Sequence, residues 1–179
     1  HFLNTNYYLK ILFLMKNTNI KVLSSSFNYI DAQDYLISTP LKKGFSNNNL
    51  YSENVIKGAL IEVLPEKYLV GSYFQGCSFA MRKELRDFVV SHFDTRIPHD
   101  WLIGVYASLN HGMYFLNKPL FQYRIHEENT LGVTFLNQSA KEHVNQSKTL
   151  EERTALAKSV LDVLEIIKVN CSWFYENKK

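Results

Sequence analysis

Short strand-like segments alternate with amphipathic helical patterns along most of this chain, and that alternation limits the folds open to it. β-Branched and aromatic residues between turn formers predict the strands, and apolar residues three or four apart predict the helices. The predicted strands span residues 20–29, 74–81, 113–116 and 120–125, and the predicted helices span residues 4–17, 52–64, 83–92 and 100–110. Elements that alternate in this way favour an α/β fold.

Prolines, glycines and polar runs set the boundaries between these elements. Residues 31–49 are rich in Asn, Ser and Lys and are predicted to form a loop. Pro65 is expected to end the second helix, and Gly112 is expected to close the fourth. Residues 117–119 are expected to form a turn that joins the last two strands.

A second helical pattern begins near Ser139 and runs toward the end of the chain. It predicts a domain at residues 1–135 and a helical extension at residues 136–179. The apolar stripe of this extension either packs on the domain or pairs with a second copy of the chain, which would make a homodimer. The stripe consists of Leu156, Val160, Val163, Leu164 and Ile167.

Composition excludes several classes of protein. The chain has 179 residues, of which 46% are apolar, which is enough for one domain with a real core. The net charge of +3 comes from scattered basic residues, so nucleic acid is not expected as a partner. Cys77 and Cys171 lie far apart and show neither metal-ligand spacing nor a disulfide framework, which is compatible with a cytoplasmic protein.

The chain contains no predicted membrane span, because its apolar run at residues 9–15 is far shorter than the roughly 20 residues a span needs. It opens with His1 and has no initiator methionine. We therefore expect it to be a fragment of a longer protein.

Asp100 stands at the predicted start of a helix, directly after Pro98 and His99. One interpretation is an N-cap that accepts a backbone N–H group. The other is a general base that takes a proton from an attacking hydroxyl. The two interpretations are compatible, because one carboxylate oxygen can cap the helix while the other faces a cleft.

Arg124 and His126 stand where the last predicted strand runs into a loop. Strand alternation puts both side chains on one face. A guanidinium and an imidazole there could bind a diphosphate, and the imidazole could also bind a divalent metal. The alternatives are an ion pair of Arg124 with Glu127 or Glu128 and a hydrogen-bonded histidine without a ligand.

Two further side chains are candidates for binding a sugar. Trp101 could stack on a sugar ring or belong to the core, and Asn129 could hydrogen-bond a sugar or form a turn. Other chemistries lack their motifs. The sequence has no phosphate-binding glycine loop, no dinucleotide fingerprint, no nucleophile elbow and no zincin spacing.

Three motifs occur in an order and spacing that resemble the family 2 glycosyltransferases of the GT-A type, in particular bacterial rhamnosyltransferase-like members. They are Gly76-Cys77-Ser78-Phe79-Ala80-Met81-Arg82-Lys83-Glu84-Leu85, His99-Asp100-Trp101, and Tyr123-Arg124-x-His126-x-x-Asn129-x-x-Gly132. The resemblance covers roughly residues 4–132.

The resemblance implies the C-terminal, acceptor-side part of a Rossmann-like GT-A domain with a mixed sheet, at the cytoplasmic side of the membrane. It implies inverting transfer from a nucleoside-diphosphate sugar, with Mn or Mg, to a hydroxyl of a surface polysaccharide, glycan or lipid-linked sugar. The residues implied are Asp100 as base, Arg124 and His126 at the donor diphosphate, His126 also at the metal, and Gly76, Trp101 and Asn129 at the acceptor.

Two departures from the family pattern change the expectation. His99 stands where the family often has an acidic residue, and the chain has no Asp-x-Asp sequence. The metal would then be bound mostly by an absent N-terminal half, and this chain alone is expected to be inactive. The alternatives are a non-catalytic glycan-binding or dimerisation module, and an unrelated α/β scaffold in which Asp100 only caps a helix.

Overall fold

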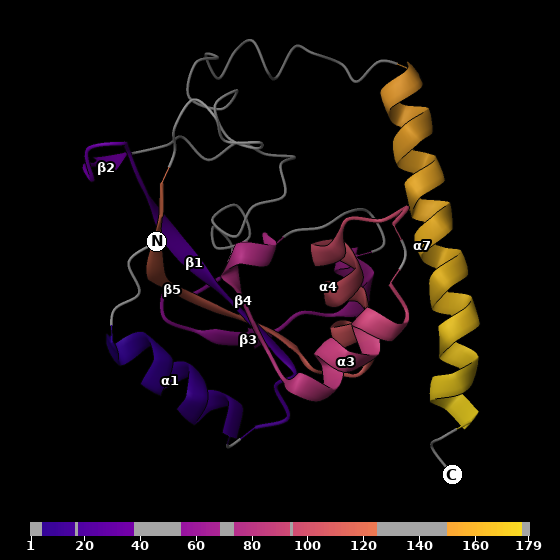
Figure 1. The fold of residues 1–179 in the computed structure, drawn as a ribbon, viewed down its shortest axis with the longest axis horizontal. Helices are drawn as coiled ribbons and strands as arrows, with labels where there is room; N and C mark the ends of the chain where they lie inside the picture. Colours follow the sequence, from indigo (N-terminus) through magenta and orange to yellow (C-terminus); the bar gives the residue numbers. More distant parts are fainter. Residues whose placement is uncertain are drawn as a thin grey trace.

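A mixed five-stranded sheet with helices on both faces forms the centre of the part of the chain described by this computed structural model (Figure 1). The structure describes residues 5–16, 18–37, 55–68, 74–93, 95–124 and 150–176. The fold is therefore α/β, as the sequence predicts. Its elements are α1 (Thr5–Lys16), β1 (Val22–Ile30), β2 (Leu36–Ile37), β3 (Leu60–Glu62), η1 (Pro65–Tyr68), η2 (Gly76–Ser78), β4 (Phe79–Met81), α3 (Lys83–Ser91), α4 (His99–Leu109), β5 (Met113–Arg124) and α7 (Leu150–Glu176).

β1 is the central strand. It pairs in parallel with β5 and antiparallel with β2 and β4, and β3 pairs antiparallel with β5. Neighbouring residues of β1 point to opposite faces. Val22 belongs to the core under α3 and α4, whereas Leu23 belongs to the core under α1. The two faces of the sheet are therefore both covered by helices.

β5 is one continuous strand with an irregularity in its middle, so the prediction of two strands joined by a turn is wrong. Ser25 pairs with Leu116, and the pairing resumes with Phe27 opposite Phe121. The Asn117 side chain donates a hydrogen bond to the Val55 carbonyl (2.7 Å), which anchors the displaced residues. A proline such as Pro119 is tolerated at such a bulge because it has no N–H group to donate.

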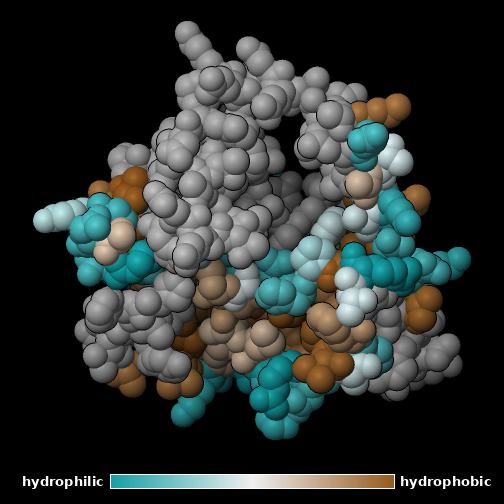
Figure 2. Space-filling model, turned by 45° about the horizontal axis from the view of Figure 1, so that its top comes forward, coloured by the Kyte–Doolittle hydropathy of each residue, from teal (hydrophilic) through white to brown (hydrophobic). Residues whose placement is uncertain are grey.

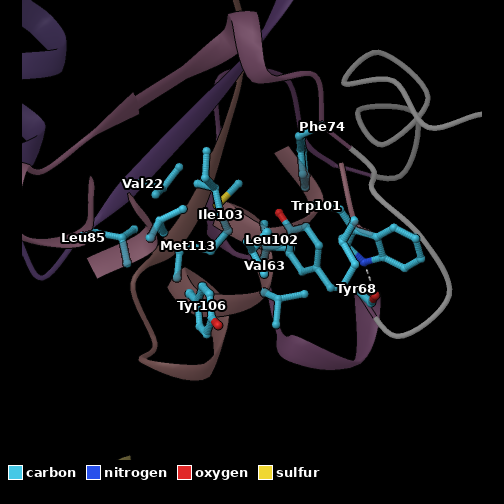
Figure 3. Close-up of a cluster of buried hydrophobic side chains, with 14 of the residues drawn as sticks. Val22, Val63, Tyr68, Phe74, Leu85, Trp101, Leu102, Ile103, Tyr106 and Met113 are labelled. Atoms are coloured by element: carbon cyan, nitrogen blue, oxygen red, sulfur yellow. Dashed lines mark hydrogen bonds between the residues drawn. The ribbon is translucent and has the colours of Figure 1, made fainter. Parts of the chain in front are cut away.

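The larger core lies between the sheet and helices α3 and α4. Most of α4 is buried, including Leu102, Val105 and Tyr106. Figure 3 shows Leu102 and Tyr106 in one cluster with Met113 and Val22 of the sheet and Tyr68 of η1. Full burial of one such side chain contributes about 1.5–3 kcal/mol, so this core holds α4 firmly against the strands.

The predicted helix at residues 52–64 is wrong. Leu60–Glu62 instead forms β3, and Pro65 begins η1 rather than ending a helix. The apolar residues of this segment occur at a spacing that fits a helix as well as a strand, and pairing with β5 decides between them.

Two other predictions need a smaller correction. The strand predicted at residues 74–81 is regular only from Phe79 onward, because Gly76–Ser78 forms a 3-10 turn. The loop predicted at residues 31–49 contains the short strand β2, which continues the sheet beside the end of β1. Its residues 38–49 lie outside the described part.

The ends of α4 are close to the predicted positions but are made differently. The N-cap residue is Pro98, not Asp100, which lies in the first turn. At the other end His111, not Gly112, has a positive φ, of 52°. Gly112 is required for a different reason: a Cβ there would lie 2.6 Å from Cγ of Lys21.

α7 packs on the domain through a small contact. Val163 is buried in the larger core, and Val160 packs against it. This contact agrees with the predicted packing of the apolar stripe on the domain. Arg96 forms ion pairs with Asp162 (3.3 Å) and Glu165 (3.7 Å). The side chains of Leu156 and Ile167, and the predicted boundary between residues 135 and 136, lie outside what the structure describes.

The outer surface of α7 carries both polar and apolar residues. Leu161 and Leu164 are exposed there. Figure 2 shows hydrophobic residues in brown between hydrophilic residues in teal on the right, where α7 lies. None of the helices within the described residues combines the length and hydropathy of a transmembrane span.

Candidate functional site

Asp100 lies half-buried in the first turn of α4, and one of its carboxylate oxygens has a defined partner. Oδ1 accepts the backbone N–H of Trp101 at 2.8 Å. The helix itself begins because Pro98 holds an extended backbone and its carbonyl accepts the N–H of Leu102 (3.1 Å). A carboxylate in this position is stabilised by the positive end of the helix dipole.

The backbone of Gly76 lies directly against this turn. A Cβ at Gly76 would be 2.7 Å from Nε2 of His99 and 3.5 Å from Cβ of Asp100. Only a residue without a side chain allows η2 and the start of α4 to approach so closely without displacing the imidazole. The structure thus brings Gly76 next to His99 and Asp100, which lie more than 20 residues further along the sequence.

Cys77, the next residue, extends the cluster toward the sheet. Burial of the thiol raises the pKa of Cys77 even though the residue has exposed atoms; its own backbone hydrogen bond lowers the pKa, and the negative charge of Asp100 raises it. Cys77 is therefore a neutral thiol at physiological pH, next to the carboxylate. It is a poor nucleophile, since the thiolate is the reactive form.

Tyr29 and Tyr123 form the strand side of this cluster. They are partners in the parallel β1–β5 ladder, with ring centroids 6.0 Å apart in an edge-to-face arrangement. Burial raises the pKa of Tyr29 to about 12, with further contributions from Tyr123 and Cys77. Neither tyrosine was predicted as a site residue, because only the register between β1 and β5 places them side by side.

The cluster lies toward the carboxyl ends of the two parallel strands. α4 is joined to the amino end of β5 by a short turn, and its 11 residues span about 16 Å. Its first turn, which contains Asp100, therefore lies far from the amino end of β5 and toward the carboxyl end of that strand. In α/β sheets the carboxyl ends of parallel strands are the usual place for a ligand.

Trp101 belongs to the core. It is 5% exposed, and its indole N–H donates to the carbonyl of Tyr68 at 2.7 Å (Figure 3). This bond ties the end of η1 to the first turn of α4. Trp101 thus fixes the position of the backbone next to Asp100, and contact of its ring with an acceptor stays a prediction.

Arg124 holds the turn between β1 and β2. Its Nη1 donates to the carbonyls of Asp31 (2.9 Å) and Ala32 (3.1 Å), and its Nη2 pairs with the carboxylate of Asp34. The side chain still keeps 28% of its surface exposed. Asp34 is thus an acidic partner of Arg124 that was not predicted, and the predicted partners Glu127 and Glu128 lie outside the described residues.

The remaining predicted residues, His126 and Asn129, also lie outside the described part of the chain. Within the described part, no group of three or more His, Cys, Asp and Glu side chains is arranged to hold a metal ion. The Mn or Mg expected from the resemblance stays a prediction.

Comparison with known proteins identifies no relative of this chain. No family model, curated protein or solved structure matches this chain.

The pKa of Tyr29 leads to a prediction about alkaline stability. A phenol whose pKa is about 12 in the folded chain and near 10 when unfolded keeps its proton more tightly in the fold. The unfolded state loses this proton first, so stability should fall as the pH rises from about 10 to about 12. We expect Tyr29→Phe to lose less stability over this range than the wild type, measured by urea unfolding at each pH.

Tyr35→Phe is the matched control for this experiment. Tyr35 is 71% exposed on the turn before β2, and its replacement leaves Tyr29 in place. This variant should therefore show the wild-type loss of stability. Equal alkaline losses in Tyr29→Phe and Tyr35→Phe would contradict the assignment to Tyr29.

Proposed function

We propose that this chain is the acceptor-side part of an inverting GT-A glycosyltransferase in which Asp100 is the general base. The observation that supports the proposal is the approach of Gly76 to His99 and Asp100 toward the carboxyl ends of β1 and β5. Two of the three motifs that resemble family 2 enzymes meet at this contact, although they are separated in the sequence.

The proposed step is a single displacement. A hydroxyl of the acceptor attacks the anomeric carbon of the donor while the bond from that carbon to the diphosphate oxygen breaks. The hydroxyl proton passes to the oxygen of Asp100 that does not bind Trp101, and the nucleoside diphosphate leaves. Attack from the face opposite the leaving group inverts the anomeric centre.

The donor side of the proposal rests on the end of β5. Arg124 lies on the same parallel strand pair as Tyr29 and Tyr123, and its guanidinium keeps an exposed part. A cation there would stabilise the charge that develops on the diphosphate. His126 and a divalent metal are proposed at the same end, and Asn129 on the acceptor side, from the resemblance alone.

The substrates are proposed only as classes. The donor is a nucleoside-diphosphate sugar, and the acceptor is a hydroxyl of a glycan, surface polysaccharide or lipid-linked sugar at the cytoplasmic side of a membrane. The second candidate is a non-catalytic module that binds glycan or pairs through α7. The exposed Leu161 and Leu164 on the outer surface of that helix favour pairing.

A transfer assay separates the two candidates. The 179-residue chain and the longest reading frame that contains it would each be incubated with a panel of nucleotide sugars and Mn or Mg, and release of nucleoside diphosphate would be measured. We expect release only from the longer chain, because this sequence has no Asp-x-Asp motif. Release by the 179-residue chain would contradict the need for another half, and no release by the longer chain would favour the binding module.

A further inference from the structure

The sheet is hollowed at the end opposite Asp100. A pocket of about 640 Å³ opens beside the amino ends of β1 and β5, between the segment after α1, the first half of α3 and the turn after α4. The lining residues that matter here are Lys21, Arg82, Glu84, Leu85, Phe88 and His111. This volume is in the range of small-molecule sites, about 300–1,000 Å³.

The walls of this pocket are fixed by contacts within the chain. The Arg82 side chain donates to the carbonyls of Ile20 (2.7 Å), Thr18 (2.9 Å) and Met15, so it closes the end of α1 onto the start of α3. A wall that is already fixed lowers the cost of ordering protein side chains when a ligand binds.

The opposite wall contains a residue in an unusual backbone conformation. His111 has a φ of 52°, and its Nδ1 binds Oε1 of Glu62 at 2.9 Å. Non-glycine residues in this region are uncommon and cluster at functional sites. The floor is apolar: Leu85 is buried, and the Phe88 ring lies edge-to-face on Tyr106 with centroids 4.9 Å apart.

Lys21 is the residue that indicates the ligand. Its side chain is half-buried, and burial lowers the pKa of its ammonium group. No described residue gives this ammonium a hydrogen bond or an ion pair. The carboxylate of Glu84 lines the same pocket from the first turn of α3, where the helix dipole already stabilises it. A partly buried cation without a partner, in the wall of a pocket, favours an anion.

We propose that this pocket binds a small molecule whose phosphate or carboxylate group contacts Lys21 and whose apolar part lies on Leu85 and Phe88. The site is separate from the Asp100 cluster, because α4 spans the distance between them. The proposal does not depend on the glycosyltransferase assignment, since it uses none of the residues of that site.

The test is a titration followed by amide NMR. Phenyl phosphate carries both proposed features, inorganic phosphate carries only the anion, and phenol carries only the ring. We expect phenyl phosphate to bind most tightly and to shift the amides of Lys21, Leu85 and His111. Lys21→Met keeps the aliphatic stem but removes the charge, and should weaken phenyl phosphate binding about tenfold or more.

Lys83→Met is the matched control. Lys83 is exposed next to Arg82 and pairs with Asp87 outside the pocket, so its loss changes the net charge equally. It should bind phenyl phosphate like the wild type, and the amide spectra of both variants establish that they are folded. Equal affinity of the wild type and Lys21→Met, no binding of any probe, or shifts at Asp100 instead would each overturn the proposal.

Discussion

Replacing Asp100 with asparagine in the full chain should lower the turnover of sugar transfer by about 10²- to 10⁴-fold while leaving donor affinity unchanged. This substitution should remove the charge of Asp100 without removing its hydrogen bond. Oδ1 of Asp100 accepts the N–H of Trp101, and an asparagine carbonyl can accept the same bond. The change therefore removes the basic oxygen and keeps the contact that holds the first turn of α4.

The stability of this variant should change little. Asp100 lies at the positive end of the helix, and loss of a charge there costs about 0.3–1 kcal/mol. Turnover and the urea midpoint would be measured on the same samples. A large loss of turnover with a small loss of stability is the pattern expected for a base, whereas a structural residue would lose both together.

Asp87→Asn provides the control. Asp87 is an exposed aspartate on α3 that pairs with Lys83 and Arg86, away from the Asp100 cluster. It should keep wild-type turnover. If Asp100→Asn also turned over normally, Asp100 would have only its helix-start role, and the base would have to be another residue.

Replacing Gly104 with alanine should destabilise the fold by about 2 kcal/mol, although alanine is the better helix former. Gly104 lies in the middle of α4, where a Cβ would overlap the ring of Tyr68 and would lie 2.8 Å from its hydroxyl oxygen. Overpacking of this kind costs about 1–3 kcal/mol and occasionally more, which exceeds the gain of about 1 kcal/mol in helix propensity.

Tyr68 cannot move aside to relieve this overlap. It is 1% exposed, its ring packs on Phe74, and its carbonyl accepts the indole N–H of Trp101. α4 would have to shift instead, and Asp100 would shift with it. Gly104→Ala therefore tests the contact that places the candidate base, independently of any activity.

Two comparisons make this result specific. In Gly76→Ala the new Cβ meets the end of the exposed His99 side chain, which can rotate away. The loss of stability should therefore be smaller than in Gly104→Ala. Tyr68→Leu removes the ring atoms that overlap, so Gly104→Ala should cost less in that background than in the wild type. Urea unfolding measures all four variants, and a Gly104→Ala protein as stable as the wild type would contradict the close packing of α4 on η1.

The sequence by itself determined the elements whose signals are local. α1, α3 and α4 were predicted within about two residues, because their apolar spacing and flanking prolines and polar residues act within one or two helical turns. β1 was predicted from its β-branched and aromatic residues, and the α/β class followed from the order of these elements.

The errors occurred where a distant strand decides the local structure. Leu60–Glu62 is a strand because β5 supplies its hydrogen-bond partners, and residues 113–124 are one strand because β1 pairs with both halves. Neither partner is adjacent in sequence, so a local pattern contains no information about them.

The same distinction applies to the candidate site. The sequence indicated Asp100 and Gly76 as separate motifs, and Arg124 as a cation at a strand end. Tertiary structure decided that Gly76 touches the turn of Asp100, that Arg124 pairs with Asp34, and that the Trp101 indole is bonded within the core. It also made Tyr29 a neighbour of Tyr123 and left Lys21 half-buried without an acidic partner. Chain proximity sets helices and turns, whereas strand register and helix packing set which side chains meet.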